Sequence, residues 1–154
     1  MRELRRGDIP DLTRILHETG AFTPVEIECA LELLSIVLDE PNQRDYVVIV
    51  AEDAGQVAGY VLYGPVPLTE GNFDIYWIAT DPCLHGRGFG RRLITQAEEE
   101  AKQQGARLIS LETSSQGGYA RTRRFYLETG YLEECRIKDF YRPGDDRITY
   151  VKRF

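Results

Sequence analysis

The stretch Phe73–Arg92 reads FDIYWIATDPCLHGRGFGRR and contains the strongest structural signals of the chain. Residues 73–80 are rich in aromatic and β-branched side chains, which is typical of a strand. Three glycines then fall within residues 86–90, and a helical apolar pattern follows over residues 91–104. The stretch therefore predicts a strand, a glycine-rich loop and a long helix in direct succession.

The glycine-rich loop is suited to binding an anion. Glycines leave backbone N–H groups accessible, and the start of a helix adds unpaired N–H groups with a partial positive charge. Arg87, Arg91 and Arg92 lie here without an acidic neighbour, although the chain is acidic overall. Cations in the first turn of a helix oppose its dipole, so a bound polyanion would compensate for them. The alternative is a solvated loop whose arginines serve solubility.

Two common nucleotide-binding loops do not match this stretch. The dinucleotide fingerprint Gly-x-Gly-x-x-Gly begins at Gly86 and Gly88 but meets Arg91 where its third glycine belongs. The phosphate loop Gly-x-x-x-x-Gly-Lys-Ser/Thr occurs nowhere in the chain. Neither of these two common nucleotide-binding loops is therefore present.

The rest of the chain predicts one mixed α/β layer structure. Thr23 and Glu26 form the pattern of a helix capping box, and Asp8 is expected to cap the helix before it. Asp53–Gln56 reads as a hairpin turn between two apolar strands. We expect strands at 1–6, 46–51, 57–66, 73–80, 108–113, 131–140 and 147–154, and helices at 8–20, 23–41, 91–104 and 119–129.

Composition excludes several classes of protein. The 154 residues fit a single domain, 1–154, and carry a net charge of -6 with a pI near 5.0. This balance argues against a broad nucleic-acid surface or a polybasic membrane protein. No apolar run is long enough to span a bilayer or to serve as a secretory signal. Three widely spaced cysteines suit a reducing compartment, so we expect a cytoplasmic protein without a metal site.

Two motifs in register resemble those of the GNAT superfamily of acyl-CoA-dependent N-acetyltransferases. The first is Gln/Arg-x-x-Gly-x-Gly/Ala, which here reads His85-x-x-Gly88-x-Gly90 after the turn Asp81-Pro82. The second is Phe-Tyr-x-x-x-Gly-Phe/Tyr, which here spans residues 125–131. His85 departs from the first motif, but the loop amides are unaffected by that change. The resemblance covers essentially the whole chain.

The resemblance implies a GNAT fold, with a mixed, mostly antiparallel sheet flanked by helices on both faces, and acetyl-CoA as cosubstrate. It places the pantetheine arm and thioester along the main chain of the strand 73–80 and the pyrophosphate on the loop amides. Many members carry an asparagine seven residues before their catalytic tyrosine, where this chain has Tyr119. The implied cofactor-binding residues are Ile78, Ala79, Thr80, His85, Gly86, Arg87, Gly88, Phe89, Gly90, Arg91 and Tyr119.

The resemblance also implies catalytic residues for direct acetyl transfer. Tyr126 matches the family's general acid for the departing thiolate; the alternative is a core tyrosine beside Phe125. Asp74, eleven residues before His85, matches the offset of a catalytic base, and its shorter side chain would act through water. The alternative for Asp74 is a solvated carboxylate at the start of a strand. Glu112 and Ser114 are further candidates for the base.

The acceptor is less defined than the cosubstrate. Residues 139–146, DFYRPGDD, hold three acids and two aromatic residues, which would favour a cationic amine such as a polyamine, an amino acid or a peptide N-terminus. The alternative is a plain polar turn. Three functions stay open: an active N-acetyltransferase, an inactive acyl-CoA-binding module on the same fold, and a loop for another nucleotide. A homodimer is compatible with the sequence.

Overall fold

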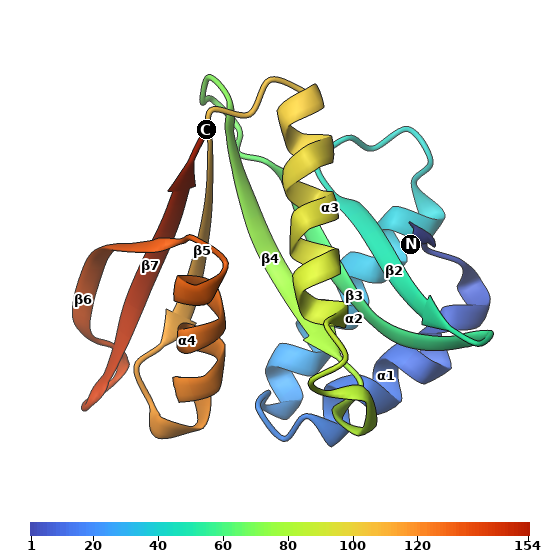
Figure 1. Ribbon diagram of the computed structural model, residues 1–154, viewed down its shortest axis with the longest axis horizontal. Coiled ribbons are helices and arrows are strands. Elements are labelled where there is room, and N and C mark those ends of the chain that lie inside the picture. Colours follow the sequence, from blue (N-terminus) through green and yellow to red (C-terminus); the bar gives the residue numbers. More distant parts are fainter.

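The computed structural model describes residues 1–154 and contains one seven-stranded sheet (Figure 1). The strand order is β1-β2-β3-β4-β5-β7-β6, and only the β4–β5 pair is parallel. The strands are β1 (Arg2–Glu3), β2 (Val47–Asp53), β3 (Gln56–Pro65), β4 (Asn72–Thr80), β5 (Leu108–Ser114), β6 (Leu132–Arg142) and β7 (Asp145–Arg153).

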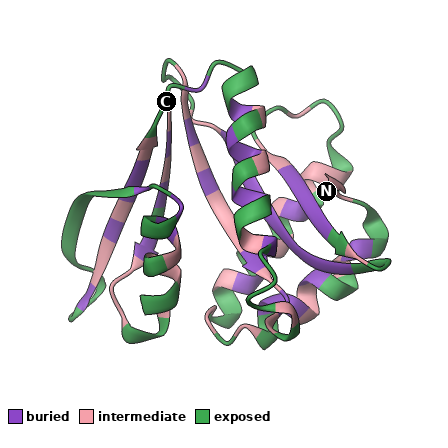
Figure 2. Cartoon of the chain, in the orientation of Figure 1, coloured by how far each residue is buried: buried purple, intermediate pink, exposed green.

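Four helices cover the two faces of the sheet. They are α1 (Ile9–Glu18), α2 (Pro24–Asp39), α3 (Phe89–Gln103) and α4 (Ala120–Glu128). One core cluster joins α3 and α4 to one face, and a second joins α1 and α2 to the other. Figure 2 shows the buried residues concentrated on the central strands and the helix sides that meet them. The predicted fold, a mixed, mostly antiparallel sheet with helices on both faces, is confirmed.

Local signals explain several element boundaries. The capping box of α2 is present, because the Thr23 N–H donates to the Glu26 carboxylate at 2.7 Å and the Glu26 N–H donates to Thr23 Oγ1 at 3.3 Å. The predicted hairpin turn joins β2 to β3, with Ala54 and Gly55 both in the left-handed region. This pair of positive φ angles gives the turn a twist that matches the flanking strands.

Two sequence expectations about helix starts are wrong. The Asp8 carboxylate does not cap α1; it accepts hydrogen bonds from Arg2 at 2.7 and 2.8 Å and from the Arg5 N–H at 2.8 Å. These contacts tie β1 to the turn before α1. The third helix begins at Phe89 rather than Arg91, because Gly88 adopts a φ of +81° and reverses the chain there. None of the helices combines the length and apolar character needed to cross a lipid bilayer.

The feature that positions the site is the separation of β4 from β5. The two strands pair only where Asn72–Ile75 lies beside Leu108–Leu111, and they diverge beyond that point (Figure 1). Just past Ile75, Tyr76 is an extra residue in the pairing with β3. Such a bulge bends its strand, so β4 follows β3 while β5 continues with β7.

Candidate active site

The opening between β4 and β5 exposes main-chain groups of β4. The Asp81 N–H donates to Ala58 O of β3 at 2.9 Å. Successive backbone groups of a strand alternate in direction, so the N–H groups of Ile78 and Thr80 face the opposite edge, toward the opening. They have no strand partner there, because the β4–β5 pairing has already ended. The opening therefore offers a ladder of unpaired donors to an extended ligand.

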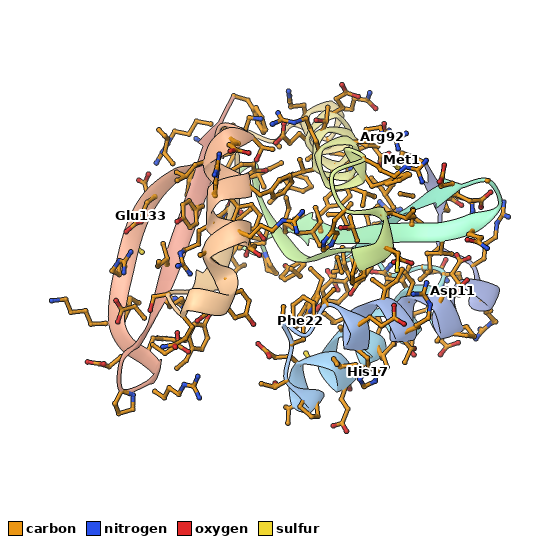
Figure 3. All side chains as sticks on the ribbon, turned by 60° about the horizontal axis from the view of Figure 1, so that its bottom comes forward. Met1, Asp11, His17, Phe22, Arg92 and Glu133 are labelled. Atoms are coloured by element: carbon orange, nitrogen blue, oxygen red, sulfur yellow. The ribbon has the colours of Figure 1, made fainter.

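A groove of about 710 Å³ continues this opening along the glycine-rich loop. Its walls come from the end of β4, the start of α3, the α1–α2 loop and α4. Nine predicted cofactor-binding residues line it together: Ile78, Ala79, Thr80, His85, Gly86, Gly88, Phe89, Gly90 and Arg91. The labelled Phe22 marks the α1–α2 side of this groove in Figure 3. The structure thus brings the two ends of the first motif into one continuous surface.

The loop is shaped for close approach of a ligand. Gly86 and Gly88 both have a φ of +81°, and a Cβ built on either glycine would meet nothing within 4 Å. The space beside them is therefore open, and the glycines are required by backbone conformation rather than by protein packing. The N–H groups at the start of α3 border the same space, which completes an anion cradle.

The arginines around the loop divide into two groups. Arg87 turns away to pair with Asp53 at 2.6 Å and does not line the groove. Arg92 stacks on the Phe89 ring, 4.3 Å from its centroid. Arg91 does line the groove, and it donates to Glu128 O at 3.3 Å. Only part of the expected arginine cluster thus faces the ligand space.

Arg121 is a groove residue that sequence reasoning missed. It lies on α4, and its Nη1 is 3.1 Å from His85 Nδ1. Arg121 therefore holds a positive charge across the groove from the loop, beside the motif position where the family has glutamine or arginine. The only sequence signal was the basic run of residues 121–124, which gives no indication of which arginine crosses to the loop.

Tyr126 is buried at the centre of an aromatic cluster. Its ring centroid lies 5.7 Å from Phe125, 6.2 Å from Tyr131 and 5.8 Å from Tyr150. Burial raises the pKa of Tyr126 above its ordinary value, and the nearby hydroxyls of Tyr119 and Tyr150 raise it further. The phenol is therefore protonated throughout the neutral range. Tyr126 is not among the residues that line the groove, and its role as the acid stays a prediction.

Tyr119 connects the two sides of the opening. Its hydroxyl donates to Ala21 O, on the α1–α2 loop, at 2.6 Å. Burial raises the pKa of Tyr119 to about 12, with further contributions from Glu26, Asp145 and Tyr141. Tyr119 lies outside the residues that line the groove, at the end nearest the β6–β7 hairpin. Its cofactor contact stays a prediction.

The three candidate bases lie on the sheet face opposite α4. Asp74 lies just above the point where the strands diverge, and its carboxylate accepts a hydrogen bond from the Ser110 hydroxyl. The Ser114 hydroxyl donates a hydrogen bond to the Asp145 carboxylate, so its proton is already engaged within the protein. The exposed Glu112 carboxylate lies 3.4 Å from Arg147 Nε. Asp74 is the only one of the three on β4, the strand whose free amides line the opening.

Three comparisons relate the chain to known proteins. The acetyltransferase (GNAT) family matches residues 12–131. An aminoalkylphosphonate N-acetyltransferase from Salmonella typhimurium is 31% identical over 142 residues, covering 84% of this chain and 91% of the relative.

Solved structures extend the likeness to the fold. A protein from Desulfovibrio desulfuricans assigned to the GNAT family of acetyltransferases is 38% identical, with a TM-score of 0.95 over 99% of this chain and 96% of that one. An aminoglycoside 6'-N-acetyltransferase complexed with coenzyme A has the same fold at 16% identity, with a TM-score of 0.75 over 99% of this chain and 95% of that one.

Proposed function

The chain belongs to the GNAT family of acetyltransferases, and on that basis we propose that it transfers the acetyl group of acetyl-CoA directly to a primary amine of a small molecule or peptide. The observation that carries the proposal is the opening between β4 and β5. It joins two unpaired β4 amides to a glycine-rich loop at a helix start, which suits a ligand with an amide-bearing arm and a polyanionic end.

In this proposal acetyl-CoA lies along the groove. The pyrophosphate rests on the amides of residues 86–91, and Arg121 adds a charge from the opposite wall. The pantetheine arm extends β4 by bonding to the free main-chain groups of Ile78 and Thr80. The solved aminoglycoside acetyltransferase with coenzyme A, which has the same fold, supports this choice of cosubstrate.

The proposed chemistry needs one attack and two proton transfers. The neutral amine nitrogen attacks the thioester carbonyl carbon, and the Ile78 N–H stabilises the resulting oxyanion. The C–S bond then breaks, and the sulfur takes the phenol proton of Tyr126. A water held by Asp74 takes the proton lost by the amine nitrogen and passes one of its own protons to the Asp74 carboxylate, which later releases it to solvent. The Tyr126 phenolate regains its proton from solvent before the next turnover.

The pKa values fit these roles. The free thiol of CoA has a pKa of about 8.5, and a lysine-like amine has one of about 10.4. The thiolate therefore gains from a proton donor at neutral pH, and the amine needs help to lose its proton. Burial keeps the Tyr126 phenol protonated at neutral pH, and it also makes this phenol a weaker acid than a free one, so the proton moves only as negative charge develops on the sulfur. Asp74 accepts a hydrogen bond from Ser110 and lies near the divergence of the strands. In this proposal a water bridges its carboxylate to the acceptor.

The test is thiol release from acetyl-CoA with a panel of amines: amino acids, polyamines, aminoglycosides, aminoalkylphosphonates and peptides. Acetyl-CoA alone should raise the melting temperature by mass action. Release of thiol that depends on an amine supports the transferase. A thermal shift without turnover on any amine would favour the inactive CoA-binding module. A larger shift with NAD or ATP than with acetyl-CoA would refute the cosubstrate.

A further inference from the structure

A polar surface faces the opening on the side away from α4. Residues Leu111 and Thr113 of β5 pair with Tyr150 and Ile148 of β7, and all four are buried on the α4 side. The alternate residues of β5 and β7 therefore point to the opposite face. The core under α1 and α2 takes no residue from β5 or β7, so no helix covers this face.

Arg147 projects on this uncovered face. It pairs with Ser114 of β5, directly beside the opening. Its guanidinium lies over the Phe140 ring, 4.3 Å from the centroid, and its side chain is only 25% exposed. The stacked ring holds the planar group in place. The side chain of Arg147 is thus held in a defined position, unlike that of a fully exposed surface arginine.

The donors of Arg147 are unused by the protein. Its buried Nε donates no hydrogen bond, and Glu112, its one charged neighbour, lies 3.4 Å away without the geometry of one. Arg2 is buried to a similar degree, at 20% exposed, and donates to Glu52 at 2.7 Å and to Asp8 at 2.7 and 2.8 Å. A mostly buried guanidinium normally donates hydrogen bonds to protein acceptors in this way. Nε of Arg147 is buried and faces Glu112, but the two Nη groups make no hydrogen bond to the protein and can bind a partner outside the chain.

The acids near Arg147 are already occupied. Asp145 accepts from Ser114, and Glu26 is engaged in the capping box with Thr23. The surface therefore carries carboxylates that are bonded to the protein, next to a guanidinium whose charged neighbour is the exposed Glu112, 3.4 Å from its Nε. This arrangement fits a molecule with two charges: an amine near the acids and an anion at the fork of Arg147.

We propose that Arg147 binds an acidic group of the acceptor, so that the substrate is a small primary amine carrying a carboxylate or phosphonate. This inference rests on the proposed acetyltransferase function and names its substrate class. A guanidinium presents two parallel N–H donors that match the two oxygens of either group. Tyr141 is half exposed on the same hairpin and lies near both Glu112 and Arg147, so its hydroxyl is a further donor for the acceptor.

The experiment compares four amines with acetyl-CoA: β-alanine, aminoethylphosphonate, propylamine and trimethylenediamine. For the wild type, kcat/KM should be about 10- to 100-fold higher for the two acidic amines, as a charge-assisted contact predicts. Arg147→Met keeps an apolar stem over Phe140 and should remove that preference by raising KM, with kcat/KM for propylamine changed less than about twofold. Arg147→Lys should restore part of the preference, since it returns the charge without the fork.

Arg153→Met is the matched control, because Arg153 is an exposed arginine of the same strand paired with Glu134. It should leave all four amines unchanged. The ranking of β-alanine against aminoethylphosphonate identifies which acidic group fits. Wild-type preference for propylamine or trimethylenediamine would overturn the inference while leaving the acetyltransferase in place, as would an equal loss on all amines in Arg147→Met. Absence of turnover on all four amines would overturn the inference, while the wider amine panel decides the acetyltransferase function.

Discussion

Replacement of Tyr126 by phenylalanine tests the proposed role of the hydroxyl as an acid without disturbing the packing of the aromatic ring. The variant keeps the ring that contacts Phe125, Tyr131 and Tyr150 and removes only the hydroxyl. Burial and neighbouring hydroxyls, rather than a hydrogen bond, set the raised pKa of Tyr126. Loss of a hydroxyl without a protein partner costs little, so the free energy of unfolding should change by less than about 1 kcal/mol.

The effect on turnover follows from the leaving group. A general acid contributes about 10²- to 10⁴-fold, and a thiolate is a good leaving group with a conjugate pKa of only about 8.5. The loss in kcat should therefore lie near the lower end, about 100-fold at neutral pH. The KM for acetyl-CoA should stay within a few fold, since the hydroxyl lies away from the pyrophosphate loop.

The assay is thiol release at saturating amine, with thermal unfolding measured in parallel. Tyr131→Phe is the matched control, because Tyr131 is a buried tyrosine of the same cluster, with a hydroxyl that has no hydrogen-bond partner. It should keep wild-type turnover. Wild-type kcat in Tyr126→Phe would refute the acid role, and an equal loss in both variants would assign the effect to packing.

Three further predictions concern the loop, the core and the pH range. Gly88→Asp should lower acetyl-CoA affinity at least about tenfold by placing a carboxylate and a strained φ at the phosphate site, and unchanged affinity in a calorimetric titration would show that the loop does not bind phosphate. Lys152→Met should destabilise the fold by about 3–5 kcal/mol in denaturant unfolding, because it leaves buried Glu98 without the ammonium at 2.7 Å, and a Glu98→Gln/Lys152→Met double variant should recover part of that loss. Burial raises the pKa of Tyr60, Tyr63, Tyr126 and Tyr131 above the unfolded value of about 10, so stability should be lost as pH rises beyond about 10, and a flat free energy of unfolding between pH 9 and 11 by circular dichroism would contradict the burial of these hydroxyls.

Local chemistry made much of the fold predictable. The Thr23–Glu26 capping box, the Asp53–Gln56 turn and the strand–loop–helix stretch each depend on residues close in sequence. Asp8 failed as a cap because Arg2 competes for its carboxylate, a contact that depends on where β1 lies in the sheet. The start of α3 was misplaced because the conformation of Gly88 sets it.

The site was predictable in its loop and not in its side-chain partners. The motif identified the groove residues because backbone amides need only the local fold to be in place. Arg121 meets His85 from 36 positions away, and Tyr119 meets Ala21 from 98 positions away. Arg147 becomes a candidate only in the structure, because its lack of hydrogen bonds to the protein cannot be predicted from the sequence. Such contacts are set by the packing of distant elements, which one sequence does not specify.

The central claim is that an acetyl group moves from CoA to an amine in one step. The most direct test is mass spectrometry of the products when the wild-type protein, acetyl-CoA labelled in its acetyl carbonyl and an amine from the panel are incubated together. Direct transfer predicts an N-acetylated amine that carries the label, in an amount equal to the free thiol released. In Tyr126→Phe both products should fall together. Label found only in free acetate, or retained on the protein, would contradict direct transfer.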